Sequence, residues 1–190
     1  NLALLSMTIE RIPHQGIRAH DETVDAARLL CQGVVDRLQQ ALLMYKAANG
    51  TFHPVIDAYS PHDMVSRIRD SAMALARGRI RVEASLAPDL PAIWFFDREL
   101  IEMALINAIH NSLTYAQSVI RIEASLMDGC LALTVRDDSS GYPAHILASM
   151  ATGMPCRAAG TGLGLQFSRL IARSHENQGR TGDLRLHNDA

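Results

Sequence analysis

The sequence has few cysteines, few aromatic residues and no marked excess of either charge. Its three cysteines, Cys31, Cys130 and Cys156, lie far apart and form no C-x-x-C pair, which argues against a disulfide framework or a zinc site. We expect reduced thiols, as in a cytosolic protein. A formal net charge of -2 with scattered arginines offers no basic surface to the phosphates of a nucleic acid, so we expect no nucleic-acid partner.

Long apolar runs are also lacking. No stretch approaches the ~20 apolar residues that cross a bilayer, and no signal peptide is visible. We therefore expect a cytoplasmic domain, with any membrane anchor lying in segments upstream of Asn1. Apolar residues nevertheless make up 48% of the chain and charged residues 20%, so the sequence can bury a core and is not expected to be disordered.

The first fifty residues have a helical pattern. Apolar residues repeat every three or four positions in residues 2–12, until Pro13 ends the helix. Asp21 can cap a second helix that stops at Gly50. Its apolar residues fall on two heptad positions, which are Val24, Cys31, Leu38 and Tyr45, and Ala27, Val34, Ala41 and Ala48. Because a two-helix hairpin cannot bury such a stripe alone, residues 1–50 are predicted to form a dimeric four-helix bundle. The alternative is a hairpin that packs on the rest of its own chain.

Residues 51–190 combine strand and helix patterns. Ser60-Pro61 can open a helix, Asp97 can cap another, and the turn around Asp128 can join a hairpin. Strands are expected at residues 52–59, 79–86, 92–96, 118–126, 130–136 and 184–186, and helices at residues 61–77, 97–116 and 163–174. The pattern predicts an α+β fold in which a mostly antiparallel sheet carries its helices on one face.

Three short segments carry candidate chemistry, and the first is ALINAIHNSLTYA. It places Asn107 and Asn111 four residues apart, so both side chains project from one helix face. Asparagine is a poor residue for a helix interior, and its carbonyl oxygen is a suitable ligand for Mg²⁺. The alternative is that both are ordinary solvent-facing residues.

The other two segments follow a strand and open a helix. In VRDDSSGYP, Asp137 can accept a hydrogen bond from an adenine amino group, because a carboxylate is an acceptor only; the alternative is an ordinary Asx turn. The last segment is Gly160-Thr161-Gly162-Leu163-Gly164-Leu165, at the start of the final helix. Glycine amides at a helix N-terminus favour phosphate binding over a simple loop.

In this order the three segments resemble the N, G1 and G2 boxes of the GHKL ATPase superfamily, and within it the chain resembles the histidine kinases. The resemblance implies a GHKL (Bergerat) type α/β sandwich in residues 51–190, after a dimerisation and phosphotransfer hairpin in residues 1–50. It further implies ATP and Mg²⁺ as cofactors. The implied reaction is autophosphorylation of a histidine, followed by phosphotransfer to a response regulator in two-component signalling.

The resemblance also assigns roles to residues. It implies that Asn111 binds Mg²⁺ and that Asn107 holds a water or metal on the phosphate side during catalysis. Asp137 would read adenine, with Tyr115 beside the base and Gly141 in the same turn. The implied phosphate end consists of Gly160, Thr161, Gly162, Leu163 and Gly164. Residues 144–159 would form a mobile lid.

Two features depart from the family pattern. Ser139 stands where the G1 box usually has its first glycine. The residues after Asn1 resemble those that follow a phosphoacceptor histidine, so that histidine is expected upstream.

Two other functions stay open. One is a regulatory or phosphotransfer scaffold with weak or no ATP binding, which Ser139 favours. The other is an ATP-driven clamp of the DNA-repair or chaperone type. Such clamps usually have a general-base carboxylate one turn before the metal asparagine, and Asn107 at that position argues against hydrolysis.

Overall fold

The computed structural model describes residues 18–152, 163–177 and 179–188. Its contacts divide the chain into two compact units, Asn1–Phe52 and His53–Ala190. The predicted helix at residues 2–12 lies outside the described residues, so the hairpin stays a prediction. None of the described helices is long and apolar enough to cross a membrane.

The described part of the first unit contains one long helix, α2 (Arg18–Ala48). It begins three residues before Asp21, so the prediction that Asp21 caps it is wrong: a capping residue leaves helical geometry, and here that geometry continues to Arg18. The predicted stop is confirmed. Gly50 adopts a left-handed φ of 66°, and the amides of Gly50 and Thr51 close the helix end on carbonyls of its last turn.

The predicted apolar stripe lies exposed on α2. Every member whose side chain is described is exposed, namely Cys31, Val34, Leu38, Ala41, Tyr45 and Ala48. This helix therefore presents the face that was expected to seek a partner.

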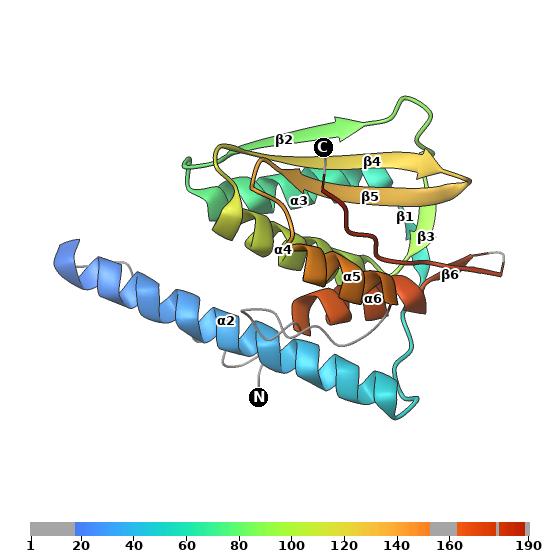
Figure 1. Ribbon diagram of the computed structural model, residues 1–190, viewed down its shortest axis with the longest axis horizontal. Coiled ribbons are helices and arrows are strands. Elements are labelled where there is room, and N and C mark those ends of the chain that lie inside the picture. Colours follow the sequence, from blue (N-terminus) through green and yellow to red (C-terminus); the bar gives the residue numbers. More distant parts are fainter. Residues whose placement is uncertain (1–17, 153–162, 178, 189–190) are drawn as a thin grey trace. The chain divides into compact units, whose positions relative to one another are not determined.

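The second unit alternates short strands and helices (Figure 1). In chain order its elements are β1 (Asp57–Tyr59), α3 (Pro61–Ala76), β2 (Arg81–Leu86), β3 (Trp94–Phe96), α4 (Arg98–Tyr115), β4 (Val119–Met127), β5 (Cys130–Asp137), α5 (Ala144–Thr152), α6 (Leu163–Ser174), β6 (Glu176–Asn177) and β7 (Arg180–Thr181).

Local sequence signals place most of these elements. Ser60 accepts a hydrogen bond from the Asp63 amide and caps α3, and Asp97 caps α4 through the Leu100 amide. Asp128 and Gly129 both have positive φ, 51° and 73°, as a two-residue hairpin turn requires. The predicted final helix at residues 163–174 is α6, with the same bounds.

The main sheet has the strand order β2-β4-β5. Strand β4 is antiparallel to β5 but parallel to β2, so the prediction of a mostly antiparallel sheet holds for the β4–β5 hairpin and fails at β2. The pairs β1–β3 and β6–β7 are antiparallel. Figure 1 shows the helices of this unit on one side of the main sheet: α3 and α4 contact its strands, and α6 packs on α4.

Two predicted strands differ from the structure. Of residues 52–59 only Asp57–Tyr59 is a strand, and residues 184–186 are not a strand. A strand forms only where its backbone hydrogen-bonds to a neighbouring strand. The extended segments before β1 and after β7 pair with no described strand. The short helix α5 and the β6–β7 hairpin were not predicted.

The core lies between the main sheet and helices α3 and α4. Its buried residues are Met64, Val65, Ile68, Ala72, Phe96, Leu105, Ile109, Ile122 and Ala124. Leu131, Leu133 and Val135 of β5 pack against it from the alternate positions of their strand. This packing fixes which face α4 and β5 turn toward each other.

Candidate functional site

Helix α4 carries the two asparagines, and its start is firmly held. The Asp97 carboxylate accepts hydrogen bonds from the Leu100 amide (3.1 Å) and the Val55 amide (2.7 Å). The Asp97 amide donates to His175 Nε2 (2.9 Å), while His175 Nδ1 lies 2.8 Å from the Ile171 carbonyl oxygen. Through these two ring nitrogens His175 joins the end of α6 to the start of α4.

Asn111 lies in the fourth turn of α4 and is partly buried. The side-chain amide of Asn111 makes no hydrogen bond to another residue of the described ranges. A side-chain carbonyl oxygen without a hydrogen-bond partner can coordinate Mg²⁺, so Asn111 fits the implied metal. Tyr115, one turn further on, is 68% exposed and leaves a ring surface open to a ligand.

Asp137 ends β5 and points toward α4. Strand residues two apart share a face, so Asp137 lies on the core-facing side of the sheet with Val135. Its Oδ2 accepts a 2.6 Å hydrogen bond from the Ser112 hydroxyl of α4, and its Oδ1 accepts the Ser139 amide at 3.0 Å. The Asx turn weighed as the alternative is thus present. It leaves the exposed carboxylate with acceptor capacity for a ligand.

The turn after Asp137 accommodates Ser139 without strain. The Ser139 hydroxyl accepts the Gly141 amide at 3.2 Å and so closes the turn. Gly141 has a φ of 80°, whereas Ser139 does not have positive φ. The left-handed conformation that favours glycine is therefore needed at Gly141 and not at the departing position.

Asn188 clamps the far end of this turn. Its Oδ1 accepts the Tyr142 amide (2.8 Å) and its Nδ2 donates to the Tyr142 carbonyl oxygen (2.9 Å). A Cβ on Gly141 would lie 2.6 Å from the Asn188 side chain. Because glycine has no side chain, the Asn188 side chain can reach the turn at Gly141.

Tyr142 brings a second phenol to the same place. Burial is the largest cause that raises the pKa of Tyr142. The negative charge of Asp137 raises this pKa further, and the electrostatic effect of Tyr115 raises it in turn. The ring of Tyr142 therefore lies in the neighbourhood of the two residues expected to meet a base. No sequence signal had singled it out.

Asn107 joins α4 to the start of α6. Its Nδ2 donates to the buried Ser168 hydroxyl at 3.1 Å. A Cβ on Gly164 would lie 2.6 Å from Asn107 Oδ1, so the glycine allows the two helices to approach. Asn107 and Gly164, 57 positions apart, thus lie in contact, which brings the first and third candidate segments together. Gly160, Thr161 and Gly162 lie outside the described residues.

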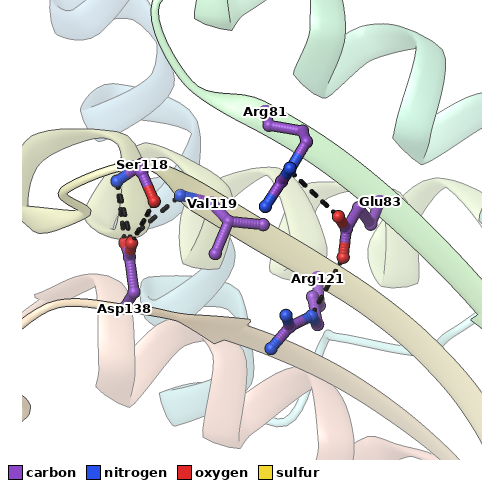
Figure 2. Close-up of polar contacts among 6 residues, drawn as sticks. All are labelled: Arg81, Glu83, Ser118, Val119, Arg121 and Asp138. Atoms are coloured by element: carbon purple, nitrogen blue, oxygen red, sulfur yellow. Dashed lines mark hydrogen bonds and ion pairs between the residues drawn. The ribbon is translucent and has the colours of Figure 1, made fainter.

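Asp138 has a different partner set from Asp137. Figure 2 shows its carboxylate accepting hydrogen bonds from the Ser118 hydroxyl (2.6 Å), the Ser118 amide and the Val119 amide; it also accepts the Gln117 amide. These bonds, the Ser118 hydroxyl first, hold the pKa of Asp138 well below its usual range. Asp138 therefore fixes the loop between α4 and β4.

The outer face of the sheet carries surface ion pairs. Glu83 lies between Arg81 and Arg121 at 3.0 Å from each, as Figure 2 shows. Exposed pairs of this kind contribute about 0–1 kcal/mol each. They are on the opposite side of the sheet from Asp137, so they are not part of the site.

Within the described ranges no three His, Cys, Asp or Glu side chains form a group able to hold a metal ion. The residues missed by sequence reasoning are Ser112, Tyr142 and Asn188. Serine beside Asn111 carried no signal, because its role depends on a strand 25 residues away. Asn188 likewise acts across 46 positions.

A protein-family model and several solved structures match this chain. Residues 96–189 match the model of the histidine kinase-, DNA gyrase B- and HSP90-like ATPase family. No curated protein matches the sequence.

Solved structures share the fold at low sequence identity. Histidine kinase AdeS of Acinetobacter baumannii has a TM-score of 0.61 and 16% identity over 98% of this chain and 94% of its own. Full-length ShkA in complex with AMPPNP has a TM-score of 0.68 and 16% identity; the match covers 91% of this chain and 38% of that one. The catalytic domain of histidine kinase ThkA in a nucleotide-free form has a TM-score of 0.54 and 19% identity over 63% of this chain and 82% of its own.

The matched region includes α4 with both asparagines, the turn after β5 and the start of α6. It has the mixed α/β architecture of this ATPase family, and its structural neighbours are sensor histidine kinases. Residues 96–189 of this chain therefore belong to the family of histidine kinase-, DNA gyrase B- and HSP90-like ATPases.

Proposed function

We propose that this chain binds ATP with Mg²⁺ and acts as the catalytic region of a sensor histidine kinase. Its ATP would phosphorylate a histidine, from which the phosphoryl group passes to an aspartate of a response regulator. ATP and such regulators are cytoplasmic, so we place this domain in the cytoplasm. The ShkA structure, which holds AMPPNP and shares the fold, supports a nucleotide as the ligand.

One observation carries the proposal: α4 contacts both other candidate segments. Ser112 bonds Asp137 at 2.6 Å, and Asn107 packs on Gly164 at the start of α6. The next residue to Ser112 is Asn111, whose amide faces no described hydrogen-bond partner. Packing around α4 therefore brings three features together. They are a hydrogen-bond acceptor for a base, an oxygen ligand for a cation, and a helix start suited to phosphate.

The residues divide the work of binding and positioning. Asp137 accepts the adenine amino group, Tyr115 and Tyr142 flank the base, and the start of α6 binds phosphate through backbone amides. Bound Mg²⁺ would neutralise phosphate charge, with the Asn111 carbonyl oxygen as its protein ligand. Catalysis in such transfers rests mainly on positioning and charge stabilisation, which this framework of fixed side chains supplies.

A scaffold with a decayed ATP site is the second candidate, and Ser139 was the feature in its favour. In the structure Ser139 closes the turn through its hydroxyl and lacks positive φ. The serine is thus compatible with the turn that carries Asp137, which favours a working site.

Calorimetry of the full chain with ATP tests the proposal. We expect binding in the presence of Mg²⁺ and much weaker binding in EDTA. Asp137→Asn should weaken ATP about tenfold, because a hydrogen bond to a charged group contributes roughly 1.5–3 kcal/mol. Asn111→Ala should remove the dependence on Mg²⁺ while the thermal melt stays unchanged, since Asn111 lies outside the buried core.

Asp89→Asn is the matched control, because Asp89 is an exposed aspartate in a loop away from the candidate segments. It should bind ATP like the parent chain. A parent chain that binds no ATP would favour the scaffold. Kinase activity itself is tested by labelling with γ-³²P-ATP in a protein that carries the expected histidine ahead of Asn1. There, Asn111→Ala should abolish the label.

A further inference from the structure

We propose that Ser112 is a positioning residue that orients the Asp137 carboxylate, and that it thereby makes the site select a base with an exocyclic amino group over the corresponding 6-oxo base. The inference rests on the proposed function, because it concerns the base that the same site binds. It deepens that function by naming what sets its specificity.

The Ser112 hydroxyl is a fixed donor. The residue is 5% exposed, so solvent does not compete for its hydroxyl. Its oxygen lies 2.6 Å from Asp137 Oδ2, the length of a hydrogen bond to an ionised acceptor. Since an ionised carboxylate only accepts, the proton of this bond belongs to Ser112.

Ser112 holds Asp137 from outside its own turn. The other carboxylate oxygen accepts the Ser139 amide, which belongs to the same turn and moves with it. Ser112 instead belongs to α4, whose start is held by Asp97 and whose face packs in the core. Among the described residues, Ser112 is thus the partner that ties the carboxylate to a different element.

A carboxylate held in this way distinguishes two purines. The 6-amino group of adenine donates to it, whereas the 6-oxo group of hypoxanthine places a second acceptor against an anion. Without Ser112 the carboxylate turns with its own loop, and this discrimination weakens. ATP and ITP differ in the atoms that matter here, while their ribose and phosphates are the same.

Asp138, the residue after Asp137, forms a matched control pair with Ser118. The Ser118 hydroxyl donates to Asp138 Oδ2, also at 2.6 Å. That pair holds the loop before β4 and belongs to no part of the proposed binding site. Ser118→Ala therefore removes the same kind of hydrogen bond without touching Asp137.

The experiment is calorimetric titration of the full chain with ATP and with ITP, both with Mg²⁺. Ser112→Ala should weaken ATP about tenfold and leave ITP within about twofold of the parent chain, so the ATP preference falls. Ser112→Cys fills the same buried space with a weak donor, and its ATP affinity should lie between the two. Ser118→Ala should keep the parent preference.

A double variant separates positioning from a merely structural role. Ser112→Ala should cost nothing further in a chain that already carries Asp137→Asn, because Ser112 acts through that carboxylate. A Ser112→Ala chain that weakens ATP and ITP equally, or that binds ATP like the parent, would overturn the inference while the proposed function stands. If Ser112→Ala fails to fold, the ATP-to-ITP ratio of Ser112→Cys decides in the same way. A parent chain that binds no ATP would overturn both.

Discussion

Two adjacent aspartates, Asp137 and Asp138, have different tasks although the sequence presents them as equals. The strand alternation turns Asp137 toward α4, where it accepts the Ser112 hydroxyl; with the Ser139 amide it has two donors and keeps acceptor capacity. Asp138 meets three amides and a hydroxyl, which saturate its carboxylate. The number of donors around each carboxylate therefore distinguishes Asp137, the proposed binding residue, from Asp138, which holds a loop.

The donors around Asp138 predict a pH dependence of stability. Its pKa is lower in the folded chain than in the unfolded one, where it is about 3.9. The stabilisation is therefore complete above pH ~4 and is lost as the pH falls through the folded-state pKa. We expect Asp138→Asn to lower the urea midpoint at pH 7 and to differ less from the parent chain at pH 3.

Asp89→Asn again provides the comparison, since its carboxylate is exposed and far from these donors. The difference in urea midpoint between Asp89→Asn and the parent chain should be the same at pH 7 and at pH 3. A gap between Asp138→Asn and the parent chain that stays constant from pH 7 to pH 3 would contradict the role given to Asp138.

At the level of elements, the packing of α4 on α6 depends on a small residue. Gly164 has no left-handed φ that would require glycine, so the constraint is the space that Asn107 occupies. Asn107 cannot simply move aside, because Ser168 holds its amide. The glycine next to the predicted phosphate loop therefore also serves helix packing.

This contact predicts that one substitution has different effects in two backgrounds. Gly164→Ala should destabilise the parent chain by about 1–3 kcal/mol, as overpacking does. In an Asn107→Ala chain the same change should be close to neutral, because the side chain that the new Cβ would meet is gone. Urea unfolding of the four chains measures the coupling. Equal effects in both backgrounds would mean that Asn107 is not the constraint.

For the whole molecule, α2 raises the question of assembly. Four large apolar side chains on it are exposed: Val34, Leu38, Leu42 and Tyr45, at 56%, 49%, 46% and 68%. Their spacing of three or four residues places them on one face of the helix. A contiguous apolar face of this kind is typical of a contact surface. We therefore propose a homodimer through residues 1–50, in which this face of α2 meets a second copy of the chain.

Sedimentation equilibrium tests the dimer. The parent chain should sediment as a dimer, and Leu38→Glu with Leu42→Glu should make it a monomer by placing charges in the apolar face. Gln40→Glu is the control, because Gln40 is a partly exposed residue two positions from both Leu38 and Leu42 and so lies about 160° away from each around the helix. A parent chain that stays monomeric at high concentration would contradict the proposal.

The sequence by itself determined the elements whose causes are local. The caps at Ser60 and Asp97, the Asp128-Gly129 turn and the bounds of α6 depend on residues within a few positions of one another. The order of three short segments was enough to indicate the family. Hydrogen bonds of this range form in the same way wherever the segment lies, so a pattern of residue types predicts them.

Only the tertiary structure decided how distant segments meet. The parallel pairing of β2 with β4, the bond from Ser112 to Asp137 and the clamp of Asn188 on Tyr142 each join residues 20 or more positions apart. The expected strand at residues 184–186 failed for the same reason, since extended residues become a strand only beside a partner. Such contacts depend on core packing, which sets the faces that elements turn to one another, and no local pattern encodes that choice.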